Sequence, residues 1–337
     1  MTVGNEIVIL VKGAPKPSVP TVYAVICNEM YFLPAFLEHY RNMGVGQFIF
    51  LDDRSDDGSF EYLADQPDCI LASSPLRYGD RVGGQRAAHL WKNEIPRLFL
   101  QGQWAICADA DEFLFLPTAF RFLETFTRVL DEQGITAVSA TMVNFYPANI
   151  SEMESSGAPS NAAELFAAYP WFDAGPYFRW SAFGNRQIVL HGGVSERLLK
   201  KFNISKRSMS KSGLSLAIHR LKRLLLGDRN INSIGKVPLV RWSACRQYLH
   251  SHNLNERPDR NIILPLAHFK FTSALYEKIE AALASRAHAG GSRAYLAYAE
   301  ILAMMKAGDG SFLYPGSVKF VSIESFSASG LLQVRSS

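Results

Sequence analysis

The chain has 337 residues, of which 48% are apolar and 20% are charged. This composition is typical of a globular protein with a large core, and it excludes a low-complexity or intrinsically disordered chain. The 35 basic and 31 acidic residues give a net charge of only +4, which provides no ground for a nucleic-acid partner. No run of 18 apolar residues is present, so we expect no membrane-spanning helix.

The four cysteines, Cys27, Cys69, Cys107 and Cys245, are widely spaced and form no CxxC pair. Three of them lie in or beside apolar strand-like runs, where a free cysteine behaves as a small buried hydrophobic residue. The first 16 residues also lack the pattern of a secretory signal. We therefore expect a cytoplasmic protein without disulfides or structural zinc.

Short apolar runs alternate with helical patterns in the first part of the chain, which predicts an α/β fold with a parallel sheet. The predicted strands are 7–11, 21–26, 47–51, 69–72, 104–108 and 137–145. Apolar residues recur at helical spacing over 32–40 and 88–98. Pro34 fits a first helical turn, whereas Pro96 is expected to kink or end the second helix.

We predict two regions, with a nucleotide-binding half over residues 1–145 and an acceptor-binding half over 146–337. Residues 151–163 are rich in serine, glycine and other small side chains, which predicts a mobile loop. Further along, 262–271 has the pattern of a strand, and 274–306 has the composition of helices.

Polar residues follow three of the predicted strands. Asn28 and Glu29 come after 21–26, Asp52 and Asp53 after 47–51, and an acidic run after 104–108. Ligands of open α/β sheets bind beyond the carboxyl ends of the strands. The sequence therefore predicts that these side chains converge on one cleft.

The acidic run contains Asp109, Asp111 and Glu112 directly after a buried strand. Mg²⁺ and Mn²⁺ are hard cations that are commonly held by one or two carboxylates together with substrate phosphates. Asp109 and Asp111 are therefore the predicted ligands of such a cation. The alternative is that these acids form only a solvated strand end or a helix cap.

Several ordered segments together resemble the family 2-like glycosyltransferases. They are AVICNE (24–29), HYRNMGV (39–45), FIFLDDRSDDG (48–58) and WAICADADEFL (104–114), with a thinner similarity at KVPLVRW (236–242) and HFKF (268–271). The resemblance implies a GT-A fold and a metal-dependent enzyme that moves a sugar from a nucleotide-diphosphate donor to a hydroxyl acceptor. UDP is the expected nucleotide, and a saccharide or lipid-linked molecule of bacterial surface polysaccharide or glycolipid synthesis is the expected acceptor.

The resemblance also implies site residues. Asp52 or Asp53 would hold the base and ribose of the nucleotide, and Asp56 would shape the turn. The same acid-rich turn would also form as a plain Asx-type turn. A late histidine, His268, would complete the metal shell, although a histidine near a core strand can also be a hydrogen-bonded structural residue. If 262–271 is extended, Lys270 points to the same side as His268 and would meet the diphosphate. His250 and His252 are the weaker alternative to His268.

Two further groups of residues are candidates on chemical grounds. Gly83 and Gly84 precede Gln85 and Arg86 at the expected start of a helix, where backbone N–H groups and an arginine suit an anion. A transferase that inverts the anomeric carbon also needs a carboxylate to deprotonate the acceptor. The candidates for this base are Glu196 and Asp173, although Glu196 could equally be ion-paired with Arg197.

The stretch 200–230 is basic, with leucines interleaved among its lysines and arginines. It predicts either peripheral contact with an anionic membrane surface or a solvated segment over the acceptor site. Two other functions remain as alternatives: a nucleotidyltransferase that makes nucleotide-sugars, and a non-catalytic nucleotide- or carbohydrate-binding protein. The chain after the first strand of the 21–58 unit lacks the glycine-rich basic loop that a nucleotidyltransferase needs.

Overall fold

The computed structural model describes residues 7–175, 177–181, 188–204, 234–250, 252–285 and 292–334. Its centre is one ten-stranded sheet in the order β1-β4-β3-β2-β7-β13-β9-β16-β18, with β8 paired to β16. The strands of this sheet are β1 (Ile9–Lys12), β2 (Thr21–Ile26), β3 (Gln47–Asp52), β4 (Cys69–Ser73), β7 (Trp104–Cys107), β8 (Glu112–Leu114), β9 (Ala137–Asn144), β13 (Gly235–Arg241), β16 (Asp259–His268) and β18 (Gln333–Val334).

The predicted α/β class is confirmed, and the sheet is mixed. β4, β3, β2 and β7 run parallel to one another, and β9 runs parallel to β16. Between these two groups lies β13, which is antiparallel to both β7 and β9. Because β13, β16 and β18 come from beyond residue 145, both predicted regions contribute strands to the same sheet.

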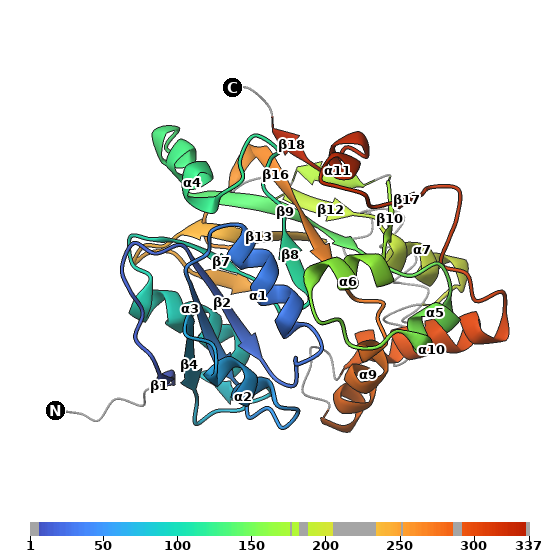
Figure 1. The fold of residues 1–337 in the computed structure, drawn as a ribbon, viewed down its shortest axis with the longest axis horizontal. Helices are drawn as coiled ribbons and strands as arrows, with labels where there is room; N and C mark the ends of the chain where they lie inside the picture. The colour runs from blue at the N-terminus through green and yellow to red at the C-terminus, as the bar shows by residue number, and fades with distance from the viewer. Residues whose placement is uncertain are drawn as a thin grey trace, which may run out of the picture.

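Helices cover both faces of the sheet (Figure 1). Val22 and Ala24 of β2 belong to the buried cluster that contains Phe36, whereas Tyr23 belongs to the cluster that contains Trp91. Successive side chains of a strand point to opposite faces, so the helices that carry Phe36 and Trp91 pack on opposite sides. The helices are α1 (Leu33–Asn42), α2 (Ser59–Ala64), α3 (Ala87–Phe99), α4 (Leu123–Glu132), α5 (Ile150–Ser155), α6 (Ala162–Ala168), α7 (Val194–Lys201), α9 (Ala274–Ser285), α10 (Arg293–Ala307) and α11 (Glu324–Ala328).

Helix α3 continues through Pro96 to Phe99 instead of ending at the proline. A proline has no N–H, so the carbonyl of Lys92, four residues earlier, loses its helical donor. The hydroxyl of Tyr23 donates to this carbonyl at 3.1 Å and satisfies it. This contact fixes the middle of α3 against β2, and it places the Lys92 side chain beside the end of β7.

The prediction of a mobile loop over 151–163 is wrong, because this stretch contains most of α5 and the start of α6. Asn149 and Asn161 cap the two helices, each with its side-chain oxygen accepting the backbone N–H three residues later, at 2.9 Å. Glu152 and Glu164 occupy those third positions, as in a capping box. The small residues of the stretch favour a loop by composition, but these two caps favour helices.

The stretch 274–306 is helical as predicted, because it contains α9 and most of α10. The remaining described strands form four two-stranded sheets. These small sheets pair β5 (Arg81–Val82) with β6 (Gln85–Arg86), β10 (Trp171–Asp173) with β17 (Ser317–Lys319), β11 (Phe178–Ser181) with β12 (Ile188–His191), and β14 (Tyr248–His250) with β15 (Asn253–Leu254). None of the described helices has the length and apolar character that crossing a membrane requires. Most of the basic stretch 200–230 lies outside the described residues.

The cysteines are free thiols, as expected. Cys69 and Cys107 are buried in the sheet. Cys27 is exposed, contrary to the prediction, because β2 ends at Ile26 and Cys27 already belongs to the turn at the carboxyl end of the strand.

Candidate functional site

The turns after β2 and β3 are tied together at the carboxyl ends of these strands. The Asn28 amide donates to Asp56 Oδ1 at 2.6 Å, and the backbone N–H of Asp56 donates back to Asn28 Oδ1 at 2.8 Å. Asn28 has a positive φ of 56°, a conformation that asparagine tolerates better than most residues. Asn28 and Asp56 therefore satisfy each other and shape the wall of the site.

Asp52 and Asp53 have different surroundings, although they are neighbours. Asp52 closes the turn, because its carboxylate accepts the Ser55 hydroxyl at 2.5 Å and the Ser55 backbone N–H at 3.2 Å. Asp53 is only 7% exposed, and its Oδ2 accepts the Tyr78 N–H at 2.8 Å. Its Oδ1 is buried and accepts no hydrogen bond from the described residues, and the nearest cation is an Arg54 nitrogen 4.0 Å away.

A buried carboxylate oxygen without a donor is unfavourable. Burial accordingly raises the pKa of Asp53, although the N–H of Tyr78 acts in the opposite direction. Of the two aspartates, Asp53 is thus the one that has an acceptor oxygen left for a ligand N–H or O–H group.

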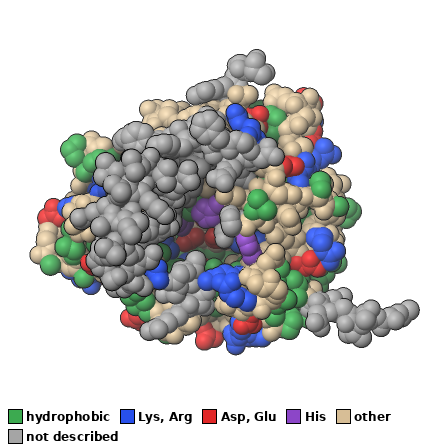
Figure 2. Space-filling view, turned by 180° about the vertical axis from the view of Figure 1, so that it is seen from behind, with side chains coloured by type: hydrophobic (Ala, Val, Ile, Leu, Met, Phe, Trp, Pro, Cys, Tyr) green, Lys and Arg blue, Asp and Glu red, His purple; other side chains and the backbone are tan. Residues whose placement is uncertain are grey.

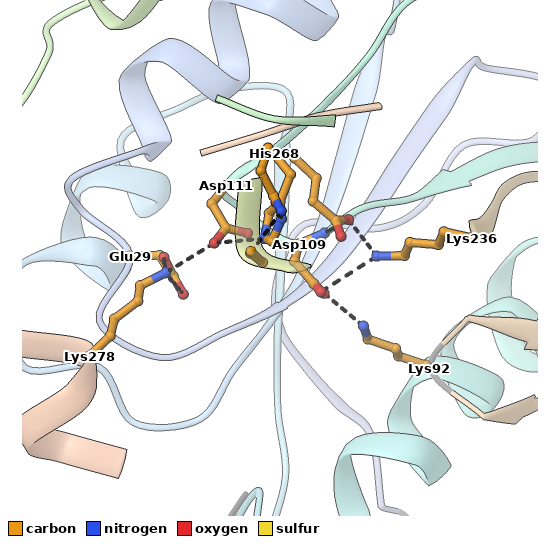
Figure 3. Close-up of polar contacts among 10 residues, drawn as sticks. Glu29, Lys92, Asp109, Asp111, Lys236, His268 and Lys278 are labelled. Atoms are coloured by element: carbon orange, nitrogen blue, oxygen red, sulfur yellow. Dashed lines mark hydrogen bonds and ion pairs between the residues drawn. The ribbon is translucent and has the colours of Figure 1, made fainter. Parts of the chain in front are cut away.

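Asp109, at the end of β7, is held by two lysines (Figure 3). Its Oδ1 lies 2.7 Å from Lys92 Nζ, and its Oδ2 lies 3.5 Å from Lys236 Nζ. Lys236 also pairs with Glu112, which accepts the backbone N–H of Asp109 at 2.9 Å. Burial raises the pKa of Asp109, but the ammonium groups of Lys236 and Lys92 outweigh it and hold that pKa well below its usual range.

Asp111 points away from these lysines, toward His268 and Lys278 (Figure 3). Its Oδ2 lies 3.6 Å from His268 Nε2. The other ring nitrogen of His268, Nδ1, is 2.6 Å from Asn144 Oδ1. Because an amide oxygen only accepts hydrogen bonds, Nδ1 carries a proton in this contact, and Nε2 is the ring nitrogen that faces Asp111. The Asn144 amide in turn donates to Ser195 Oγ at 3.0 Å.

Asp111 and His268 fit a divalent cation. With ligand distances of about 2.1 Å, two ligands of one ion lie about 3 to 4.2 Å apart, which includes the observed 3.6 Å. A metal-binding histidine also has its second ring nitrogen hydrogen-bonded, as the contact with Asn144 provides. Within the described ranges, no three His, Cys, Asp or Glu side chains are grouped so as to hold a metal. Substrate oxygens and water would therefore complete the shell, as is usual for Mg²⁺.

Asp109, the second predicted ligand, faces the two lysines instead. Its side chain is 44% exposed, so it remains accessible to a bound molecule. The structure thus separates the two aspartates, because Asp111 faces His268 and Asp109 faces Lys92 and Lys236.

Glu29 and Lys278 form an ion pair next to Asp111. Lys278 Nζ lies 3.0 and 2.8 Å from the two carboxylate oxygens of Glu29 and 3.6 Å from Asp111 Oδ2. Burial raises the pKa of Glu29 to about 7; Lys278 lowers it and Asp111 raises it. Lys92, Lys236 and Lys278 were not predicted as site residues. Only Lys236 carried a signal, because it opens the KVPLVRW segment of the resemblance.

The prediction of one strand over 262–271 placed Lys270 on the same strand as His268. In the structure β16 ends at His268, so Lys270 lies beyond the strand. The backbone turns there, with the Lys270 N–H donating to the His268 carbonyl at 3.1 Å. The ammonium of Lys270 lies 4.6 Å from the ring centre of Tyr295 and 5.3 Å from that of Tyr298. His252, the alternative histidine, faces the carbonyl of Gly235 at 3.2 Å and is not part of the Asp111 pair.

Gln85 and Arg86 form a hairpin strand that directly precedes a helix, and Arg86 is the N-cap residue of α3, so their role in binding an anion stays a prediction. Gly83 and Gly84 have positive φ values of 57° and 81° and form the two-residue turn of the hairpin β5–β6. Two such residues in succession favour a hairpin turn over a helix start. Helix α3 begins only at Ala87, and Gln85 is exposed on the hairpin.

The two candidate bases differ in their contacts. Asp173 is 2% exposed, and its carboxylate is occupied by Arg197 at 3.0 and 3.1 Å and by the Tyr146 hydroxyl at 2.5 Å. Both carboxylate oxygens are engaged in this buried ion pair, so the geometry does not favour Asp173 as the base. Arg197 is the partner of Asp173 and not of Glu196.

Glu196 lies in the first turn of α7 and pairs through Oε1 with Lys200 at 2.5 Å. Its Oε2 is buried and makes no hydrogen bond within the described part of the chain. The preceding residue, Ser195, accepts the hydrogen bond of Asn144, which in turn anchors His268. This chain of contacts connects the start of α7 to the Asp111–His268 pair.

One face of the molecule has a hollow in which acidic and histidine side chains gather, with lysine or arginine side chains near its rim (Figure 2). In comparisons with known proteins, no family model matches the chain, and no curated protein matches it significantly. The function is therefore inferred from the geometry of the site.

Proposed function

We propose that the chain is a GT-A glycosyltransferase that moves a sugar from a nucleotide-diphosphate donor to a hydroxyl acceptor, assisted by Mn²⁺ or Mg²⁺. The observation that carries the proposal is the Asp111–His268 pair, with its anchored histidine, at the carboxyl end of the β2–β3–β7 sheet region. Asp53, with its unused buried oxygen, comes from the same end of the adjacent strand β3. Ligands of α/β sheets bind in this position.

Different residues of the site would contact different parts of the donor. Asp53 Oδ1 would accept an N–H of the base or a ribose hydroxyl. Lys92 and Lys236, which are held by Asp109, supply positive charge that suits the diphosphate. A cation between Asp111 and His268 would neutralise the charge that develops on the departing diphosphate.

Glu196 is the proposed base for the acceptor. Its free Oε2 would take the proton of the acceptor hydroxyl while that oxygen bonds to the anomeric carbon and the bond from this carbon to the diphosphate breaks. The acceptor would be a saccharide or a lipid-linked molecule of surface polysaccharide or glycolipid synthesis, and the reaction would take place in the cytoplasm.

Calorimetry with UDP, GDP, CDP and dTDP, each with and without Mn²⁺, tests the donor site. Asp111→Asn should abolish the metal dependence of nucleotide binding, whereas Asp53→Asn should weaken binding even without metal. Asp131→Asn is the matched control, because Asp131 pairs with Arg241 and Trp104 at the opposite end of β7. Absence of binding for all four nucleotides under both conditions would refute the proposal.

Release of free sugar from the donor tests whether the protein is an enzyme or only a binding protein. Glu196→Gln should retain donor affinity and lose most of the turnover, since the amide cannot accept the proton. Equal rates for the wild type and this variant would exclude Glu196 as the base.

A further inference from the structure

Lys278 places an ammonium group where it interacts with a proposed metal ligand. Its Nζ lies 3.6 Å from Asp111 Oδ2, the same distance that separates this oxygen from His268 Nε2. All three side chains are mostly buried, with exposures of 21% for Lys278, 11% for Asp111 and 15% for His268. A cation bound between Asp111 and His268 would therefore lie next to a fixed positive charge.

Lys278 is anchored in this position. Both carboxylate oxygens of Glu29 contact its ammonium, at 2.8 and 3.0 Å, and the ammonium also lies 4.9 Å from the ring centre of Phe32. Glu29 follows β2 and Lys278 belongs to α9, so the contact joins segments that are far apart in the sequence. The pair with Glu29 therefore holds the ammonium of Lys278 beside Asp111.

The acids of the site are already matched by lysines. Four carboxylates form ion pairs with three ammonium groups, and the residues are Glu29, Asp109, Asp111 and Glu112 with Lys92, Lys236 and Lys278. A divalent cation entering alone therefore finds the carboxylate of Asp111 already next to an ammonium group. A nucleotide diphosphate brings negative charge and oxygen ligands, and it offers the ammonium of Lys278 a second partner.

We infer that Lys278 serves as an internal counter-cation of Asp111 that makes binding of the divalent cation depend on the nucleotide diphosphate. The inference rests on the proposed function and adds to it that the cation binds tightly only together with the nucleotide diphosphate. The cation alone binds weakly because it replaces an attraction between Lys278 and Asp111 with a repulsion. The cation and the diphosphate together restore the charge balance, so each raises the affinity of the other.

A titration of the protein with Mn²⁺ alone, monitored through the electron paramagnetic resonance of the free ion, measures the affinity for the cation directly. Lys278→Gln should bind Mn²⁺ about tenfold more tightly than the wild type or better, since an ammonium a few ångströms from the ion no longer repels it. Lys278→Met, which retains the aliphatic stem, should behave in the same way. Lys278→Arg keeps the charge and should bind as weakly as the wild type.

The second measurement is the same titration in the presence of saturating UDP. The factor by which UDP raises Mn²⁺ affinity should be about tenfold smaller in Lys278→Gln than in the wild type. Lys306→Gln is the matched control. Lys306 lies on the neighbouring helix α10 and also pairs with a glutamate, Glu154 of α5. This variant should leave both quantities unchanged. Circular dichroism and thermal melting establish that each variant is folded.

The outcomes separate the inference from the proposed function. If the wild type binds UDP in an Mn²⁺-dependent manner and folded Lys278→Gln or Lys278→Met binds Mn²⁺ alone no more tightly, the inference is overturned and the proposed function stands. If these variants gain Mn²⁺ affinity while no nucleotide binds to any form, the counter-cation role is supported and the donor assignment fails. If neither variant binds Mn²⁺, the inference is overturned.

Discussion

Replacing Lys236 with methionine is expected to destabilise the fold through Glu112. The two side chains form an ion pair that is almost completely buried, with exposures of 0% for Lys236 and 1% for Glu112. Methionine retains the length of the side chain and removes its charge. The Glu112 carboxylate then remains in the interior without its cation, and among the described residues only the backbone N–H of Asp109 still donates to it.

The expected loss is large relative to the stability of the protein. Breaking a buried pair by removing one partner costs about 3–5 kcal/mol, compared with a total of roughly 5–15 kcal/mol for a folded protein. The lost contact with Asp109 adds little, since this side chain is 44% exposed. Adding Glu112→Gln should recover about half of the loss or more, because glutamine removes the buried charge and its oxygen can still accept the N–H of Asp109.

Urea unfolding followed by the fluorescence of the buried Trp91 and Trp242 measures these differences. Burial already raises the pKa of Glu112, and Lys236 acts against this rise. Without Lys236 the folded-state pKa rises further, so the deficit of Lys236→Met should shrink as the pH falls and Glu112 takes up a proton. A deficit below about 1 kcal/mol, or a double variant no more stable than Lys236→Met, would refute the reasoning.

Three other predictions concern stability and metal binding. Burial lowers the pKa of His39 to about 4, so the stability it contributes is present above its unfolded pKa near 6.5 and is lost as the pH falls toward 4. Urea titrations at a series of pH values should show roughly 3 kcal/mol of this loss in the wild type and much less in His39→Gln. Asn144→Leu should weaken Mn²⁺ binding in the presence of UDP by about 10–100-fold, because His268 loses its anchor; unchanged affinity in calorimetry would contradict this. Arg197→Met should destabilise the fold by about 3–5 kcal/mol in urea titrations, because it leaves the buried Asp173 carboxylate without its cation. Adding Asp173→Asn should reverse part of that loss, and a double variant no more stable than Arg197→Met would contradict this reasoning.

Elements with a strong local pattern could be predicted from the sequence. β2 and α1 follow from the apolar run 21–26 and from helical spacing around a proline that fits the first turn. The stretch 151–163 could not be predicted from its composition, since two side-chain caps decide its structure. The antiparallel insertion of β13 also has no local signal, because it depends on long-range pairing with β7 and β9.

The acidic half of the site was visible because strand ends gather at one edge of a sheet. Two lysines of the basic half were not. Lys92 is one lysine in a helix and Lys278 one in another, and nothing in their neighbourhoods distinguishes them from surface lysines. Similarly, only contacts in three dimensions show that Arg197 occupies Asp173 and leaves Glu196 with a free oxygen.

The position of β13 has a consequence for the order in which the protein can fold during synthesis. Strand β7 borders β13, so its outer edge stays unpaired until the ribosome has produced residues 235–241. An unpaired strand edge is a template for pairing with other chains. Lys236 arrives with the same strand, and until then Glu112 has no cation. A nascent chain that ends near residue 145 therefore carries both an open sheet edge and an uncompensated acid, and we expect it to need a chaperone or its own later segments to avoid aggregation.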